Sequence, residues 1–116
     1  MAIIKIKNLK VKTIIGIFNH EREASQDLIL NIKIAFNSTI ASQTDNIQDT
    51  IDYQLLKRTI INSVEKSNFN LLEKLVEYIL DIIMSYTLVT SATVEIDKPD
   101  ALRFVDSVSI TSSRKR

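Results

Sequence analysis

The stretch Asp27–Phe36, DLILNIKIAF, decides the fold class because apolar and polar residues alternate along most of its length. A period of two places every second side chain on the same face of a β-strand. The odd-numbered face carries Asp27, Asn31 and Lys33. The even-numbered face is apolar throughout and consists of Leu28, Leu30, Ile32, Ile34 and Phe36. We therefore expect a strand over residues 27–36 with one face on the core.

Residues 3–14 alternate as well, but the apolar positions change from even to odd halfway along. A β-bulge near Lys7 and Asn8 would bring both halves onto one face. The connection over residues 15–26 is too long for a tight hairpin turn and holds the only glycine, Gly16. Long connections in compact domains often carry function, so we look there for part of a site.

The middle of the chain has the period of two amphipathic helices. Asp52 is a good N-cap for a helix that runs to about Ser67, with apolar residues at every fourth position. Asn70 and Glu73 have the spacing of a capping box, which predicts the start of a second helix.

Alternation returns over residues 91–97 and 104–112, and Phe104 is expected to point inward at the start of the second run. The order strand, strand, helix, helix, strand, strand predicts an α+β fold. Two antiparallel hairpins would form one four-stranded sheet, with both helices on one face. The open edges of such a sheet favour self-association.

The composition excludes several classes of protein. With 116 residues, 45% of them hydrophobic, and no cysteine, we expect one domain over residues 1–116 without disulfides or thiolate chemistry. No apolar run reaches the roughly 20 residues that span a bilayer, and the N-terminus lacks the pattern of a signal peptide. We therefore expect a cytoplasmic protein with no membrane partner. The single histidine, His20, lacks partners at metal-ligand spacing, so we assign no metal and no cofactor.

A lysine stands directly before the only proline, in EIDKPDALRF over residues 95–104. Pro99 holds the backbone of Lys98 extended, so this amine starts from a defined position. A partly buried amine there could serve as a general base. The alternative is an exposed lysine at a strand end that pairs with Asp97 or Asp100 in water.

Other polar side chains allow a functional and a structural interpretation. Glu73, next to the apolar Leu72, could accept two parallel N–H groups from a flat heterocycle, or only cap its helix. Glu21 or Glu23 could orient a ligand or be solvated. Tyr53 could offer its hydroxyl to a ligand or pack on the helix.

Alternating lysines at positions 5, 7, 10 and 12 raise a second hypothesis, a non-catalytic module for assembly or nucleic-acid binding. No RNA-binding aromatic motif, GXXG loop or basic recognition helix accompanies them. The net charge of +1 gives no overall field for nucleic acid. We therefore expect no nucleic-acid partner.

Taken together, several short segments resemble the dihydroneopterin aldolase family and its sister group, the dihydroneopterin triphosphate 2'-epimerases. The resemblance covers nearly the whole chain. The segments are Lys12-Thr13-Ile14-Ile15-Gly16-Ile17 with Glu21 and Gln26, Asp52-Tyr53, Asn70-Leu71-Leu72-Glu73-Lys74-Leu75 and Asp97-Lys98-Pro99-Asp100-Ala101.

The resemblance implies the tunnelling fold (T-fold), in which ββααββ subunits join edge to edge into a tetrameric barrel. Two barrels stack as a homo-octamer with active sites between subunits. It implies that Glu73 and the backbone of Leu72 anchor a pterin, and that Lys98 is the general acid and base. Glu21 would orient the substrate's side chain, and Tyr53 would reach in from the neighbouring subunit.

Residues 4–13 and 97–111 look closer to the epimerases, and Ser109 stands where aldolases commonly have a glycine. The resemblance therefore implies 2'-epimerisation of 7,8-dihydroneopterin triphosphate to the dihydromonapterin form. The alternative is the aldolase reaction of folate biosynthesis, which gives 6-hydroxymethyl-7,8-dihydropterin and glycolaldehyde. A triphosphate would need cations, and Lys10, Lys12, Arg103 or the basic tail could supply them.

Overall fold

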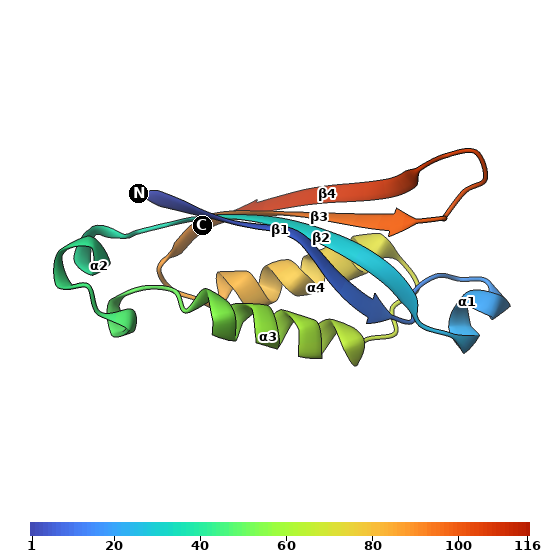
Figure 1. Ribbon diagram of the computed structural model, residues 1–116, viewed down its shortest axis with the longest axis horizontal. Helices are drawn as coiled ribbons and strands as arrows, with labels where there is room; N and C mark the ends of the chain where they lie inside the picture. The colour runs from blue at the N-terminus through green and yellow to red at the C-terminus, as the bar shows by residue number, and fades with distance from the viewer.

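The computed structural model describes residues 1–116, and Figure 1 shows a sheet that carries two long helices on one face. The four strands follow each other in the order β1-β2-β3-β4, with every neighbouring pair antiparallel. The elements are β1 (Ala2–Thr13), α1 (Asn19–Glu23), β2 (Gln26–Phe36), α2 (Thr39–Thr44), a 3-10 turn (Ile47–Asp49), α3 (Tyr53–Glu65), α4 (Leu72–Met84), β3 (Val89–Pro99) and β4 (Ser107–Lys115). The predicted α+β arrangement of strands and long helices is confirmed.

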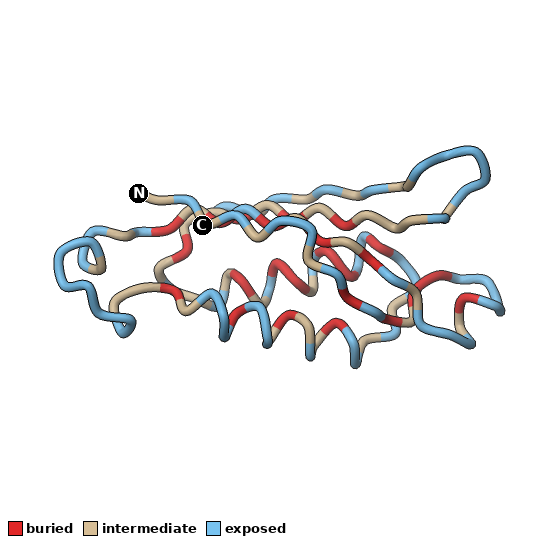
Figure 2. The backbone as a smooth tube through the Cα atoms, viewed as in Figure 1, coloured by how far each residue is buried: buried red, intermediate tan, exposed pale blue.

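The core lies between the sheet and the pair formed by α3 and α4, where the buried segments face one another in Figure 2. The five apolar even-numbered side chains of β2, from Leu28 to Phe36, are all buried, as their alternation predicts. The ridge of α3 packs on them through Leu56, Ile60 and Val64. The apolar face of α4 is broader, because six of its side chains are buried. None of the helices is long and apolar enough to cross a membrane.

A bulge in β1 keeps both halves of this strand on the core. The pairing of β1 with β2 shifts register between Ile6 and Leu9, where the sequence predicts the bulge. Asn8 has a φ of 54°, a left-handed conformation that asparagine tolerates better than most residues. Its N–H donates to the side-chain oxygen of Asn31 at 3.0 Å. The shift is what allows Val11 beyond it to be buried.

The two long helices begin differently. Asp52 caps α3 as predicted, because its carboxylate accepts the N–H groups of Gln54 and Leu55, both at 3.1 Å. The capping box predicted at Asn70 and Glu73 is wrong. The chain stays extended through Leu71, so α4 begins at Leu72 with no side-chain cap and Glu73 is its second residue.

The last strand begins later than expected. Phe104 was predicted to point inward, but it lies in the loop between β3 and β4 and is 99% exposed. Asp100 and Phe104 both have positive φ, 60° and 66°, so the chain turns here instead of continuing as a strand. Pairing resumes where Ser107 meets Pro99.

Candidate active site

Three connections meet at one end of the molecule, on the right in Figure 1. They are the β1–β2 connection with α1, the α3–α4 connection over residues 66–71, and the loop that follows β3. Because α4 runs antiparallel to β3, its first turn lies at the same end as the last residues of that strand (Figure 1). Candidate residues far apart in the sequence therefore gather at this end.

Lys98 is the penultimate residue of β3 and continues the inward-facing positions of Val94 and Ile96. It therefore points to the helix side of the sheet at the end of the core. Its amine lies 2.5 Å from a carboxylate oxygen of Glu21, and the two side chains are only 14% and 11% exposed. The alternative of a solvated lysine paired with a neighbouring aspartate is wrong. Asp97 instead accepts a hydrogen bond at 3.0 Å from the hydroxyl of Ser107.

The Glu21 carboxylate is surrounded by donors. Besides Lys98 it accepts the side-chain N–H of Gln26 at 3.2 Å and the backbone N–H of Phe18 at 3.3 Å. The hydrogen bond from Lys98 lowers the pKa of Glu21 most, burial opposes it, and the bonds from Gln26 and Phe18 add to it, which brings the pKa to about 2. Glu21 is thus ionised near neutral pH. The solvated interpretation holds for the exposed Glu23 and is wrong for Glu21.

Gly16 makes room for this carboxylate. It has a φ of 119°, and a Cβ built on it would lie 2.3 to 2.4 Å from the carboxyl atoms of Glu21. Gln26 fixes the same loop because its amide also donates to the carbonyl of Ile15 at 2.9 Å. Reasoning from the residues assigned Gly16 and Gln26 no role. The one available signal was that Gly16 is the only glycine in the chain.

The low pKa of Glu21 predicts a contribution to stability that acid removes. A carboxylate with a lower pKa in the folded state stabilises the protein above about pH 4.5, the unfolded value. That contribution is lost as the pH falls toward 2. We expect the difference in unfolding free energy between wild type and Glu21→Gln to shrink by about 1 to 3 kcal/mol between pH 5 and pH 2.5. Urea titrations at several pH values measure it, with Glu23→Gln as control. A difference that stayed constant with pH would contradict the assignment.

Leu72 and Glu73 lie at the start of α4, at the same end as Lys98 (Figure 1). The side chain of Leu72 is buried, whereas Glu73 is exposed and forms no ion pair within the chain. Tyr53 is 61% exposed and starts α3 at the opposite end. A helix of 13 residues is roughly 20 Å long. One subunit therefore brings Lys98 to Glu21 but keeps Tyr53 away from them.

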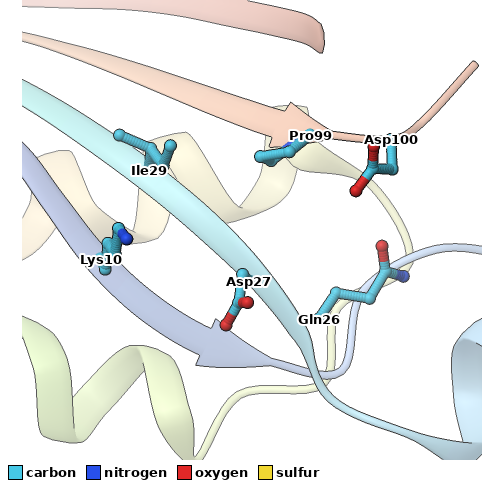
Figure 3. Close-up of a pocket in the computed structure, with 6 residues that line it drawn as sticks. All are labelled: Lys10, Gln26, Asp27, Ile29, Pro99 and Asp100. Carbon is cyan, nitrogen blue, oxygen red and sulfur yellow. The ribbon is translucent and has the colours of Figure 1, made fainter. Parts of the chain in front are cut away.

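A pocket of about 400 Å³ lies at the same end of the sheet; Gln26, one of its lining residues, donates to Glu21, but Lys10, Asp27 and Ile29 line it from the face away from the helices. Figure 3 shows Pro99 and Asp100, at the end of β3, across from Gln26 and Asp27 at the start of β2. Lys10, one of the cations suggested for a triphosphate, also lines this pocket. Within the chain no group of three or more histidine or carboxylate side chains lies close enough to hold a metal ion.

The other suggested cations have partners of their own. Lys12 pairs with Asp27 at 3.6 Å, and the guanidinium of Arg103 lies 5.6 Å from the centre of the Phe104 ring. The basic tail is not frayed. Arg116 donates to the carbonyl of Val89 at 2.8 Å, at the end of the sheet away from Lys98. The tail therefore lies too far from Lys98 and Glu21 of its own subunit to hold a triphosphate there.

Residues 4–113 match the protein family described as dihydroneopterin aldolase. The chain belongs to the dihydroneopterin aldolase family. The dihydroneopterin triphosphate 2'-epimerase of Escherichia coli K12 is 44% identical over 115 residues, which cover 99% of this chain and 96% of that protein. The epimerase of Pseudomonas aeruginosa PAO1 is 40% identical over 116 residues, covering 100% and 94%.

Among solved structures, E. coli dihydroneopterin aldolase in complex with neopterin matches with a TM-score of 0.91 and 25% identity. The match covers 98% of this chain and 99% of that one. Within the dihydroneopterin aldolase family, the chain is thus more similar to the two epimerases than to this aldolase, as the sequence predicts. Membership of this enzyme family disfavours the hypothesis of a non-catalytic module.

Proposed function

We propose that the chain converts 7,8-dihydroneopterin triphosphate into its 2'-epimer, the dihydromonapterin form, by breaking and re-forming the C1'–C2' bond. The observation that supports this most is the ion pair of Lys98 and Glu21, which places an amine beside a carboxylate in a largely dehydrated position. The identities of 44% and 40% to two epimerases support the triphosphate as substrate. Aldol cleavage of 7,8-dihydroneopterin is the alternative outcome of the same first step.

The pterin ring would bind at the start of α4. The Glu73 carboxylate is free of intramolecular ion pairs and can accept the ring's N3–H and 2-amino hydrogens side by side. The backbone of Leu72 adds a further polar contact. Leu71 provides no side-chain cap, so the first turn of α4 keeps N–H groups without a side-chain partner. These N–H groups favour the charged form of the Glu73 carboxylate in the same turn.

The side chain of the substrate would reach Lys98 and Glu21. Glu21, held by Gln26 and Phe18, accepts a hydrogen bond from a substrate hydroxyl. This new bond weakens the hydrogen bond between Glu21 and Lys98. Lys98, once its own proton has passed to solvent, takes the 2'-hydroxyl proton through a bound water. The 2'-oxygen becomes an aldehyde oxygen as the C1'–C2' bond breaks, and the bond's electrons pass into the dihydropterin ring as an enamine.

The fate of the aldehyde decides between the two reactions. Protonation of C1' and loss of the aldehyde is cleavage, whereas re-addition to the other aldehyde face gives the epimer. With the triphosphate substrate, the phosphates remain on the two-carbon aldehyde. Cations at this end of the sheet, such as Lys10 in the pocket that Gln26 and Pro99 also line, would retain that charged fragment and favour re-addition.

The proposal includes assembly of the sheet edges β1 and β4 into a tetrameric ring, with two rings forming an octamer. Tyr53 supports it, because this exposed residue starts α3, at the end of the molecule away from Lys98, and is too far from it to act within one subunit. A hollow of about 370 Å³ beside Tyr53 is lined by Ile4 and Ile6 of the edge strand β1. Tyr53 would complete the site of the neighbouring subunit.

The cytoplasmic location remains a prediction.

A product assay tests the proposal. The protein is incubated separately with 7,8-dihydroneopterin triphosphate and 7,8-dihydroneopterin, and the oxidised products are separated by chromatography. We expect a monapterin product in excess of 6-hydroxymethylpterin from the triphosphate. A dominant 6-hydroxymethylpterin peak would identify the aldolase alternative. The absence of both products would overturn the assignment as a pterin enzyme.

A further inference from the structure

Arg22 makes an unusual set of contacts next to the proposed site. It follows Glu21 in α1, but its guanidinium points to backbone carbonyls, not to a carboxylate. One terminal nitrogen donates to Gly16 at 3.2 Å and to Phe69 at 3.0 Å, and the other donates to Asn68 at 2.5 Å. Three of its five N–H donors are occupied in this way, which leaves only two for any other partner.

The three carbonyls belong to two segments that carry different parts of the proposed site. Gly16 is the residue against which the Glu21 carboxylate lies. Asn68 and Phe69 belong to the connection that leads into α4, and Glu73 follows within the first turn of that helix. One planar guanidinium thus ties the segment that places Glu21 to the segment that places Glu73.

Apart from the apolar core, in which Ile15 and Leu72 are both buried, few contacts hold these segments together. Within residues 14–25, Arg22 alone forms hydrogen bonds to residues 66–73. The nearest other link comes from the end of β1, where the Thr13 hydroxyl donates to the carbonyl of Ser67 at 2.8 Å. Helix α1 itself projects beyond the end of the sheet, as Figure 1 shows. Without Arg22, no hydrogen bond would tie α1 and its carboxylate to the segment that leads into α4.

We propose that Arg22 is a positioning residue that fixes the distance between two halves of the site. The ring half consists of Leu72 and Glu73, and the side-chain half consists of Glu21 and Lys98. The inference rests on the proposed function, in which one pterin substrate bridges both halves. A shift of about 1 Å between groups that must engage a substrate together can cost on the order of a hundredfold in rate.

The test compares a ligand that spans both halves with one that occupies the ring half alone. Neopterin has the trihydroxypropyl side chain and pterin lacks it, and in both the ring is fully oxidised, whereas the proposed substrate is a dihydropterin. Dissociation constants are measured by calorimetry for wild type and Arg22→Ala. We expect neopterin binding to weaken about tenfold or more and pterin binding to stay unchanged, so the preference for neopterin falls by the same factor.

Two further variants complete the design. Arg22→Lys keeps the charge but not the planar fork that reaches three carbonyls, so we expect it to lose most of the preference as well. If Arg22→Ala does not fold, the same comparison of neopterin and pterin is made with Arg22→Lys. Arg58→Ala removes an exposed arginine of α3 and is expected to bind both ligands as wild type does.

Equal weakening of both ligands, or no change in either, would overturn the positioning role. So would an Arg22→Lys protein that keeps the full preference for neopterin. A wild-type protein that bound neither pterin nor neopterin would instead overturn the proposed function, and the role of Arg22 with it. Turnover gives a second readout, because the loss in Arg22→Ala should appear in both KM and kcat.

Discussion

Replacing Lys98 with alanine is expected to lower kcat for the pterin reaction by on the order of a hundredfold or more, with a small change in KM. An essential acid or base contributes that much to a rate, and a hundredfold corresponds to about 2.7 kcal/mol of barrier. The ring half remains intact in this variant, because Glu73 and Leu72 lie on a different element. Steady-state kinetics with both dihydropterin substrates measures the effect.

Lys98→Arg separates proton transfer from charge. Arginine keeps a cation beside Glu21 but does not give up its proton at physiological pH, so we expect this variant to be as inactive as Lys98→Ala. Lys33→Ala removes an exposed lysine of β2 and serves as the control that should keep full activity. Activity in Lys98→Arg above about a tenth of wild type would show that charge, and not proton transfer, is what Lys98 provides.

Gly16→Ala is expected to damage stability and activity together. A Cβ at this position would lie 2.3 Å from the carboxyl carbon of Glu21, and the φ of 119° disfavours any side chain. Backbone strain of this kind costs about 1 to 3 kcal/mol, and the carboxylate must also move away from Lys98. We expect a loss of about 2 to 4 kcal/mol in unfolding free energy and at least tenfold in kcat/KM. Denaturation at one fixed protein concentration and steady-state kinetics measure the two effects.

Two comparisons separate collision from backbone strain. Asp45→Ala places alanine at another positive φ, 56°, at the far end of the molecule, so it should lose some stability and no activity. Gly16→Ala is also added to Glu21→Ala, where the carboxylate is gone. If collision matters, its cost in that background is smaller than in wild type. An equal cost in both backgrounds would mean that φ alone is responsible.

The regular elements were predictable because burial imposes a period on the residues. β2 has one face under the helices and the other open, and its alternation records this directly. The bulge in β1 was visible for the same reason, since only an extra residue keeps Ile6 and Val11 on one face. Aspartate is a common N-cap residue, and Asp52 does cap α3 as predicted.

The misses occurred where tertiary contacts override local pattern. The segment around Phe104 alternates as a strand does, but that side chain stays outside the core and the chain turns through Asp100. Asn70 and Glu73 have capping-box spacing, but Leu71 is still extended and α4 begins one residue later than that spacing predicts, at Leu72. Spacing alone did not decide either boundary.

The site was harder to predict than the fold. Lys98 and Glu21 are 77 residues apart, and no periodicity indicates that they touch. The family resemblance named both residues, whereas reasoning from the residues alone left open whether Glu21 orients a ligand or is solvated. Arg22 had no signature at all, because its partners are backbone carbonyls, which every residue possesses.

The bulge at Asn8 also limits how the length of β1 can change during evolution. Substitutions along this strand leave the pairing intact, but deleting one residue near Asn8 would move Val11 and Thr13 to the solvent side of the sheet. The hydroxyl of Thr13 would then lose its bond to Ser67, and Gly16 would no longer follow the strand in the same orientation. Homologous sequences should therefore vary in residue type here and keep the same spacing between the bulge and the glycine.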